Sequence, residues 1–251
     1  MADPVMSRGG LDASLADLAG LVTGSLGLQE LLTKVADLAA RIIPGTDGAG
    51  LLLCSDAGMG TTSRQVAALA ASAPFVAELE SLQNEICGEG PAVTATLERR
   101  TVCTGSLPRD PSWPRLGPRA GRLGVHSALA MPLLVPGQVV GALSLYARDR
   151  DVFDARAASV GELFAGPAAV AVHHAQVLAQ ARELTGQLQN ALTSRPIIDQ
   201  AIGILRARTG ASTDEALLKL RRLSQAGNTK LATVAQHLVD EAVRRARARS
   251  G

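Results

Sequence analysis

Residues 194–242 read SRPIIDQAIGILRARTGASTDEALLKLRRLSQAGNTKLATVAQHLVDEA, and this stretch decides the fold of the C-terminal part of the chain. Its aliphatic residues recur at the spacing of one helix face, in three groups that short turns of small residues separate. The groups are Ile197, Ile198, Ile202 and Leu205, then Leu217, Leu218, Leu220 and Leu223, and then Leu231, Val234, Leu238 and Val239. The stretch therefore predicts a small bundle of three short helices.

The charge of the chain is divided unevenly between its two ends. Residues 186–251 carry 11 Lys and Arg against 5 Asp and Glu, although the whole chain has 25 against 23. The N-terminal part is therefore mildly acidic. Most charged runs on helices are simply solvated, but few carboxylates are interleaved with these cations. A small basic module attached to a larger acidic domain favours contact with a polyanion through the basic end.

The same stretch resembles the ANTAR domain, the three-helix RNA-binding output module of bacterial transcription antitermination regulators. The residues that carry the resemblance are Ser194, Arg195, Pro196, Gln200, Ala201, Gly203, Arg208, Ala216, Leu220, Arg221, Ser224, Gln225, Asn228, Lys230, Leu231 and Ala235. The chain departs from many members at Ile202, where they have Lys. The resemblance implies binding to hairpin RNA in a nascent transcript, which stabilises an RNA form that prevents the terminator hairpin from folding.

Cationic and amide side chains give this stretch the chemistry of an RNA interface. Lys and Arg supply the salt-sensitive attraction to phosphates, and Asn, Gln and Ser can hydrogen-bond to the edges of unpaired bases. Small residues in mid-helix suggest close approach of a partner. We predict an RNA-binding set of Arg195, Gln200, Ala201, Gly203, Arg206, Arg208, Lys219, Arg221, Ser224, Gln225, Asn228 and Lys230. For Asn228, an N-cap of the third helix is an equally good interpretation.

The N-terminal part mixes strand and helix patterns. Strand-length apolar or β-branched runs occur at 50–54, 66–71, 101–104, 127–135 and 139–147. Helical patterns occupy 11–43, with a break at 24–27, and then 74–86 and 92–98. Pro136-Gly137 joins the last two strands as a hairpin. This mixture predicts an α+β fold with a mainly antiparallel sheet.

These landmarks resemble a GAF sensor domain of the type that precedes ANTAR domains in actinobacteria. The matching segments are Gly48-Ala49-Gly50, Gly88-Glu89-Gly90-Pro91, Trp113-Pro114, 127–133, 141–146 and Phe153-Asp154. The resemblance implies a six-stranded sheet with a pocket for an unidentified small molecule on one face. Phe153 lacks the upstream Asn-Lys partner of cyclic-nucleotide GAF domains, and no Cys-His pair for bilin attachment is present. We therefore expect no cofactor.

Apolar residues between the two modules recur at an unbroken spacing of seven. They are Leu163, Val170, Val177, Leu184, Ala191, Ile198 and Leu205. Such spacing favours a left-handed coiled coil. We expect the part up to Val177 to pack on the sheet of its own domain, and the part beyond Leu178 to form a homodimer with a second subunit. Pro196 is expected to kink the helix or restart it.

The predicted organisation is a GAF sensor domain at 11–178, a helical coiled-coil linker at 179–193 and an all-α ANTAR domain at 194–245. The N-terminus lacks the apolar core of a signal peptide, and no apolar run is long enough to span a membrane. We therefore expect a cytoplasmic protein that does not contact a membrane.

Enzymatic and metal sites find little support in the sequence. His173 and His174 are adjacent on a helix and face different directions, so no metal site is expected. No catalytic triad, phosphate loop or dinucleotide fingerprint is present, so we expect no enzyme. Two alternatives to an RNA-binding regulator stay open. One is a helix-turn-helix-like DNA-binding regulator, and the other is a thiol enzyme such as a sulfoxide reductase, if the fold brings Cys87 and Cys103 together.

Overall fold

The structure, a computed structural model, describes residues 16, 18, 20, 26–54 and 66–250. The chain divides into two compact units, residues 1–179 and 180–251, and each is described by itself. The first of the two helices predicted within 11–43 falls mostly on residues outside the described part. The second is α2, Leu28–Ile42, and it ends before Pro44 as predicted.

A sheet of five antiparallel strands forms the centre of the first unit. The strands are β1 (Gly48–Cys54), β2 (Val66–Ala71), β3 (Val102–Thr104), β4 (Ser127–Val135) and β5 (Gln138–Ala147). Their order across the sheet is β2-β1-β5-β4-β3. Val135 pairs with Gln138 across the Pro136-Gly137 turn, which confirms the predicted hairpin.

The described part of the sheet has five strands rather than the six that the resemblance implied. The long segment between β3 and β4 adds no strand to it. This segment forms a 3-10 turn, η2 (Leu107–Arg109), and a short helix, α5 (Gly117–Arg122). Pro108, Pro111, Pro114 and Pro118 fall within it. Because proline has no N–H to donate to a strand ladder, a run so rich in proline disfavours a paired strand.

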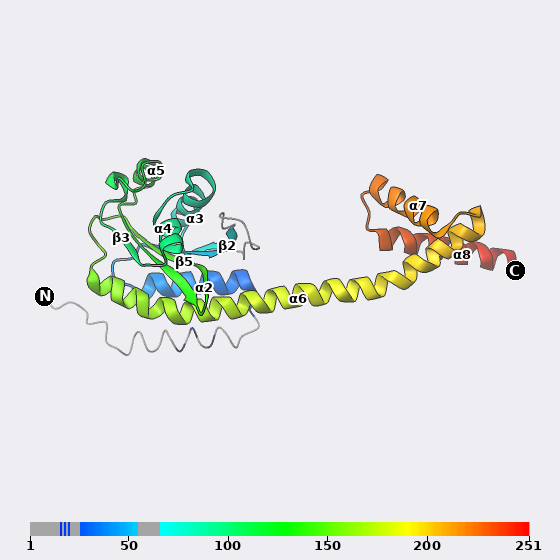
Figure 1. The fold of residues 1–251 in the computed structure, drawn as a ribbon, viewed down its shortest axis with the longest axis horizontal. Coiled ribbons are helices and arrows are strands. Elements are labelled where there is room, and N and C mark those ends of the chain that lie inside the picture. Colours follow the sequence, from blue (N-terminus) through cyan, green and yellow to red (C-terminus); the bar gives the residue numbers. More distant parts are fainter. Residues whose placement is uncertain (1–15, 17, 19, 21–25, 55–65, 251) are drawn as a thin grey trace. The chain divides into compact units, whose positions relative to one another are not determined.

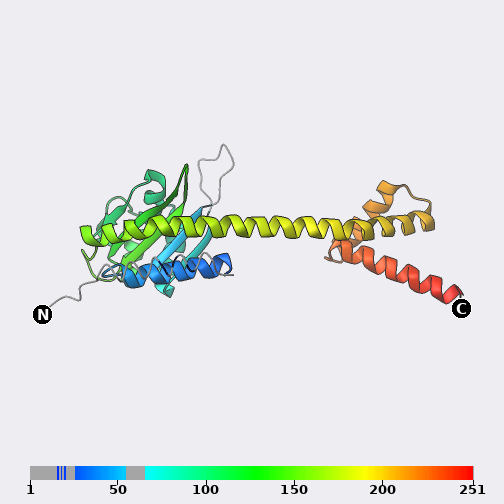
Figure 2. The same cartoon turned by 90° about the horizontal axis from the view of Figure 1, so that it is seen from below.

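Helices cover both faces of the sheet, so the first unit has a core on each side. Figures 1 and 2 show α2 and the N-terminal part of α6 (Ala155–Thr209) side by side along one face. Leu51, Leu129 and Met131 belong to the core on that side. The other face is covered by α3 (Pro74–Ser81), the π-helical turn η1 (Leu82–Cys87), α4 (Pro91–Glu98) and α5 (Figure 1).

Neighbouring residues of one strand therefore serve different cores. Ala128 and Ala130 pack with the α3–α5 layer, whereas Leu129 and Met131 pack with α2 and α6. This division follows from the alternation of side chains along a strand. It explains why β4 and β5 read as continuous apolar runs rather than as alternating ones.

The second unit is a three-helix arrangement, as predicted. It contains the C-terminal part of α6, α7 (Thr213–Ala226) and α8 (Leu231–Ser250). Its core consists of Ala201, Ile202, Leu205, Ala216, Leu220 and Ala235. Gly210, at a φ of 68°, follows the end of α6. Ser212 and Glu215 then form a capping box that starts α7.

Of the two outcomes expected at Pro196, a kink or a restart, the restart does not occur, because α6 continues through this residue. The expectation that the seven-residue stripe packs on the sheet is wrong. Leu163, Val170 and Val177 are 58%, 47% and 49% exposed, so they do not pack on the sheet. A different face of the helix packs on the sheet, at Phe164, Ala168 and Val172. The small alanine on that face lets the helix approach the sheet closely, while the seven-residue stripe faces away from it.

Candidate RNA-binding surface and sensor core

The predicted RNA-binding residues come from the helices and the second turn of the second unit. Most are exposed: Arg195, Gln200, Gly203, Arg206, Arg208, Lys219, Arg221, Gln225, Asn228 and Lys230. Ser224 is half-buried. Ala201 has no exposed surface and packs with Ala216 and Leu220 in the core. The prediction that Ala201 contacts RNA is therefore wrong, because its small side chain serves the packing of the helices.

The cations of α7 do not form a single patch. Ala216 and Leu220 mark the buried side of the helix. Because successive residues are rotated by about 100°, Lys219 and Arg221 lie on opposite flanks of that side. Arg221 shares its flank with Ser224 and Gln225, three and four residues further on. The strip of Arg221, Ser224 and Gln225, called the α7 strip below, leads into the turn before α8.

The turn before α8 is folded back on the last residues of α7. The Thr229 N–H donates to the Ser224 carbonyl at 3.0 Å, and the Asn228 N–H donates to the Gln225 carbonyl at 3.2 Å. The Ser224 hydroxyl donates to the Thr229 carbonyl at 2.5 Å. These bonds place Asn228 and Lys230 next to the end of the α7 strip.

Asn228 adopts a left-handed backbone conformation with a φ of 45°. It lies three residues before Leu231, where α8 begins, so it is not the N-cap of that helix. The capping interpretation of Asn228 is therefore wrong. Asn tolerates left-handed backbone better than most residues. Its side-chain amide makes no hydrogen bond with any residue that the structure describes, and contact with a base stays a prediction.

Gly203 lies on the exposed side of α6, and a Cβ atom there would meet nothing within 4 Å. Packing inside the unit therefore does not require a glycine at this position. Arg206 lies on the same side of the helix, but so does Asp199, seven residues before it. This side of α6 is consequently less positive than the α7 strip and the adjoining turn, where Arg221 and Lys230 form no ion pair with any described residue.

Polar side chains are buried under the α3–α5 layer of the first unit. Glu80 has no exposed surface. Its carboxylate accepts hydrogen bonds from the Tyr146 hydroxyl at 2.9 Å, from Gln83 Nε2 at 2.9 Å and from Asn84 Nδ2 at 3.2 Å. Gln83 Oε1 in turn accepts from the Ala92 N–H at 3.0 Å. Glu80, Gln83, Asn84 and Tyr146 are called the Glu80 cluster below.

Burial dominates the electrostatics of the Glu80 cluster. It raises the pKa of Glu80, although the hydrogen bonds from Tyr146, Gln83 and Asn84 favour the carboxylate. Burial, and then the proximity of Glu80, raises the pKa of Tyr146 well above its ordinary value. No described Lys or Arg forms an ion pair with Glu80. The cluster is thus a buried acid held by neutral donors.

Two glycines of the GAF-like motifs make room for this cluster. A Cβ atom at Gly50 would lie 2.6 Å from Glu80 Oε1, and one at Gly90, whose φ is 151°, would lie 2.2 Å from Gln83 Oε1. Sequence reasoning missed Glu80 and Gln83. A signal was present, because Val76, Leu79, Glu80 and Gln83 follow the spacing of one buried helix face.

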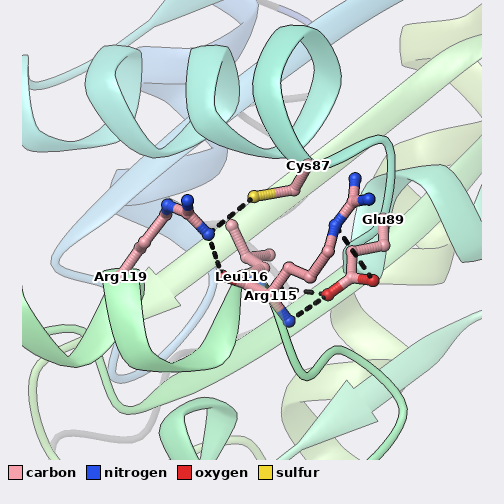
Figure 3. Close-up of polar contacts among 5 residues, drawn as sticks. All are labelled: Cys87, Glu89, Arg115, Leu116 and Arg119. Atoms are coloured by element: carbon pink, nitrogen blue, oxygen red, sulfur yellow. Dashed lines mark hydrogen bonds and ion pairs between the residues drawn. The ribbon is translucent and has the colours of Figure 1, made fainter.

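Glu89 ties the loop after η1 to α5 (Figure 3). Its Oε1 accepts the backbone N–H groups of Arg115 at 2.6 Å and Leu116 at 3.0 Å. Arg119 Nη1 donates to the Arg115 carbonyl at 2.6 Å and lies 3.7 Å from Cys87 Sγ. These contacts hold Cys87, which is buried, against α5.

The fold does not bring the two cysteines of the thiol-enzyme alternative together. Cys87 packs with Val102 in the core under α3–α5. Cys103 follows Val102 in β3 and so points to the opposite face, where its thiol donates to the Phe153 carbonyl at 3.5 Å. Both cysteines are free thiols.

The described residues contain no group of three or more His, Cys, Asp and Glu arranged to hold a metal ion. His173 Nδ1 lies 3.3 Å from Gln138 Nε2, within the first unit. Among the helices of the described part, none combines the length and apolarity needed to cross a bilayer.

Comparison with solved structures identifies relatives of the first unit. The GAF domain of a phosphoenolpyruvate-protein phosphotransferase from Coxiella burnetii is 18% identical, with a TM-score of 0.52 over 69% of this chain and 99% of that one. The corresponding Acinetobacter domain is 16% identical, with a TM-score of 0.51 over 70% and 99%. Identities this low show a shared fold alone. No curated protein sequence matches the chain.

Family models match both parts of the sequence. The GAF domain model matches residues 25–173, and the ANTAR domain model matches residues 186–239. GAF domains are sensory, and ANTAR domains are RNA-binding domains of antitermination regulators. The chain therefore belongs to the GAF domain family and is a GAF and ANTAR domain-containing protein.

Proposed function

We propose that this protein is a transcription antitermination regulator. Its ANTAR unit binds hairpin RNA in nascent transcripts and so prevents termination, and its GAF unit responds to a small-molecule or other signal. The α7 strip carries the proposal: the ANTAR match contains a cation, a hydroxyl and an amide on one flank of α7, beside a turn with a further amide and cation. This combination suits simultaneous contact with phosphates and unpaired bases.

The residues divide into two roles in this proposal. Arg221 and Lys230 neutralise phosphates, whereas Gln225 and Asn228 hydrogen-bond to base edges in a hairpin loop. Lys219, on the opposite flank of α7, contributes less. The C-terminal cations Arg244, Arg245, Arg247 and Arg249 add general attraction, which is weakest for Arg245 because it pairs with Glu241.

The protein acts as a homodimer in this proposal, joined through the exposed face of α6. Leu163, Val170, Val177 and Leu184 form a stripe along the described part of that face, and each is about half exposed. We refer to these four residues as the α6 stripe. The side chains of Leu188 and Ala191, which continue the predicted seam, lie outside the described residues. Two ANTAR units in one dimer would suit paired hairpins, and a signal in the GAF unit would act by changing the pairing of α6.

Two observations favour this role over the alternatives. The ANTAR match covers the basic three-helix unit and therefore favours RNA over duplex DNA. Cys87 and Cys103 lie on opposite faces of the sheet, which disfavours an enzyme that uses both thiols.

Binding titrations with matched nucleic acids test the proposal. The full-length protein is titrated by fluorescence anisotropy against a hairpin RNA with a six-nucleotide loop, the same stem with a four-nucleotide loop, and a duplex DNA with equal phosphate number, all at one salt concentration. We expect tightest binding to the first RNA, and a further gain when two such hairpins lie in tandem. Equal affinity for the duplex DNA would instead support the DNA-binding alternative.

A further inference from the structure

A groove of about 390 Å³ lies between the end of β4 and α6 in the GAF unit. Its lining contains apolar residues of β4 and α6: Met131, Pro132, Leu134, Ala165 and Gly166. Polar residues complete it: Arg99, Arg100, Thr101 and Glu162. No member of the Glu80 cluster lines this groove, and Met131 belongs to the core on the opposite face of the sheet from that cluster.

The charged side chains at the groove are neutralised to different degrees. Arg100 pairs with Glu98 at 2.5 Å, and one oxygen of Glu162 accepts a hydrogen bond from the Thr101 hydroxyl at 2.6 Å. Arg99 forms no ion pair or side-chain hydrogen bond with any residue that the structure describes. The groove therefore has one unpaired cation beside an apolar floor.

Arg99 also has an unfavourable backbone conformation. It caps the end of α4 with a φ of 55° and a ψ of 35°, in the left-handed region. Glycine is the usual residue at such a helix end because it has no Cβ to crowd the carbonyl oxygen. A charged side chain at this position gains nothing from the local fold, and strained residues of this kind gather at binding sites.

We propose that the groove binds a small molecule with an acidic group on an apolar body, such as an aliphatic carboxylate. Arg99 pairs with the acid, and Leu134, Pro132 and Ala165 hold the body. The volume lies within the range of small-molecule sites, which are mostly apolar with a few placed polar groups. Because Ala165 belongs to α6, the ligand would contact the helix that also supplies Ala201 and Leu205 to the core of the ANTAR unit. This proposal is independent of the RNA-binding function.

Titration of the full-length protein with octanoate and with octanamide tests the proposal. The two probes share the apolar body and differ in charge. The readout is the NMR shift of the Leu134 methyl groups. Leu134 lines the groove and is 39% exposed. We expect saturable shifts with octanoate and much weaker binding of octanamide.

Variants at Arg99 and Glu162, the two charges of the groove that form no ion pair with a described residue, sharpen the test. Arg99→Gly is expected to weaken octanoate binding about fivefold, as for one lost partly exposed charge contact. The same variant should keep or raise the melting temperature, because glycine suits the left-handed backbone. Arg99→Lys should bind nearly as wild type. Glu162→Gln, which keeps a hydrogen-bond acceptor for Thr101, should tighten binding about twofold by removing a like charge.

Three results would overturn the proposal. One is equal binding of octanoate and octanamide. Another is wild-type octanoate affinity in Arg99→Gly. The third is a Leu134 shift that follows protein concentration rather than octanoate, which would mean that a second copy of the chain occupies the groove.

Discussion

Replacing Leu184 with Asp is expected to dissociate the proposed homodimer. The four residues of the α6 stripe are 47–58% exposed. This leaves roughly 70–100 Å² of apolar surface on each, and burying one such side chain contributes about 2 kcal/mol at about 25 cal/mol per Å². Over two subunits the stripe contributes about 16 kcal/mol before the entropic cost of association, which is about 4–15 kcal/mol.

Leu184→Asp acts twice in a symmetric dimer. It removes about 4 kcal/mol of apolar burial, and it places two carboxylates near each other without cationic partners. A loss of 4 kcal/mol alone weakens the dimer about a thousandfold. Sedimentation velocity at micromolar concentration should therefore show a monomer. Circular dichroism should show a folded chain, because Leu184 is 57% exposed and outside the described cores.

Leu97→Asp is the matched control for this experiment. Leu97 is 64% exposed on α4 and does not belong to the α6 stripe, so the same change of side chain there should leave the dimer intact. A wild-type protein that sediments as a monomer, with RNA absent or present, would refute the reasoning. So would a dimer that Leu97→Asp and Leu184→Asp dissociate equally, since the effect would then come from surface charge and not from the stripe.

Three further changes test the ANTAR surface and the buried acid. Arg221→Ala should weaken hairpin binding and lower the salt slope by about one unit, whereas Lys219→Ala on the opposite flank should change both less; the reverse order in a salt titration would contradict the α7 strip. Asn228→Gly keeps the left-handed turn and removes the amide, so it should weaken loop binding about tenfold at unchanged melting temperature; wild-type affinity would leave Asn228 a turn residue only. Glu80→Gln should stabilise the protein at pH 7 but not at pH 4. The stability from protonated Glu80 is fully present below its ordinary pKa of 4.5 and is lost as the pH rises through the raised folded-state pKa. Denaturation of both proteins across this range should therefore show a steeper decline for wild type, and parallel curves would refute the assignment.

Local patterns in the sequence were sufficient to predict most elements of the fold. Val66–Ala71 and Ser127–Val135 begin and end where the apolar runs do. The three helices of the second unit also follow from spacing alone. Spacing did not predict that α6 continues through Pro196. A single missing hydrogen bond can be tolerated inside a helix of 55 residues.

The role of each face of α6 could not be predicted from periodicity. A spacing of seven at Leu163, Val170 and Val177 and a spacing of four at Phe164, Ala168 and Val172 coexist on one helix. Both spacings describe apolar faces, and the sequence alone does not determine which face packs on the sheet. The choice follows from shape: alanines permit close approach to a flat sheet, whereas protruding leucine and valine side chains suit a seam with another helix.

The roles of individual site residues were even harder to predict from the sequence than the faces of α6. Ala201 matched a binding motif, yet a small residue at the centre of a three-helix core serves packing as well as recognition. The burial of Glu80 was not predicted, because an isolated carboxylate in the sequence does not reveal which groups will donate hydrogen bonds to it. Its donor Tyr146 lies 66 residues away in sequence, and the space for it is left by Gly50 in another strand. Burial of this acid therefore depends on the assembled sheet. The informative signal in the sequence is a polar residue at a buried helix position together with glycines in strand motifs. The glycines of the GAF-like motifs therefore have two roles: they accommodate buried polar groups, and they allow the chain to turn.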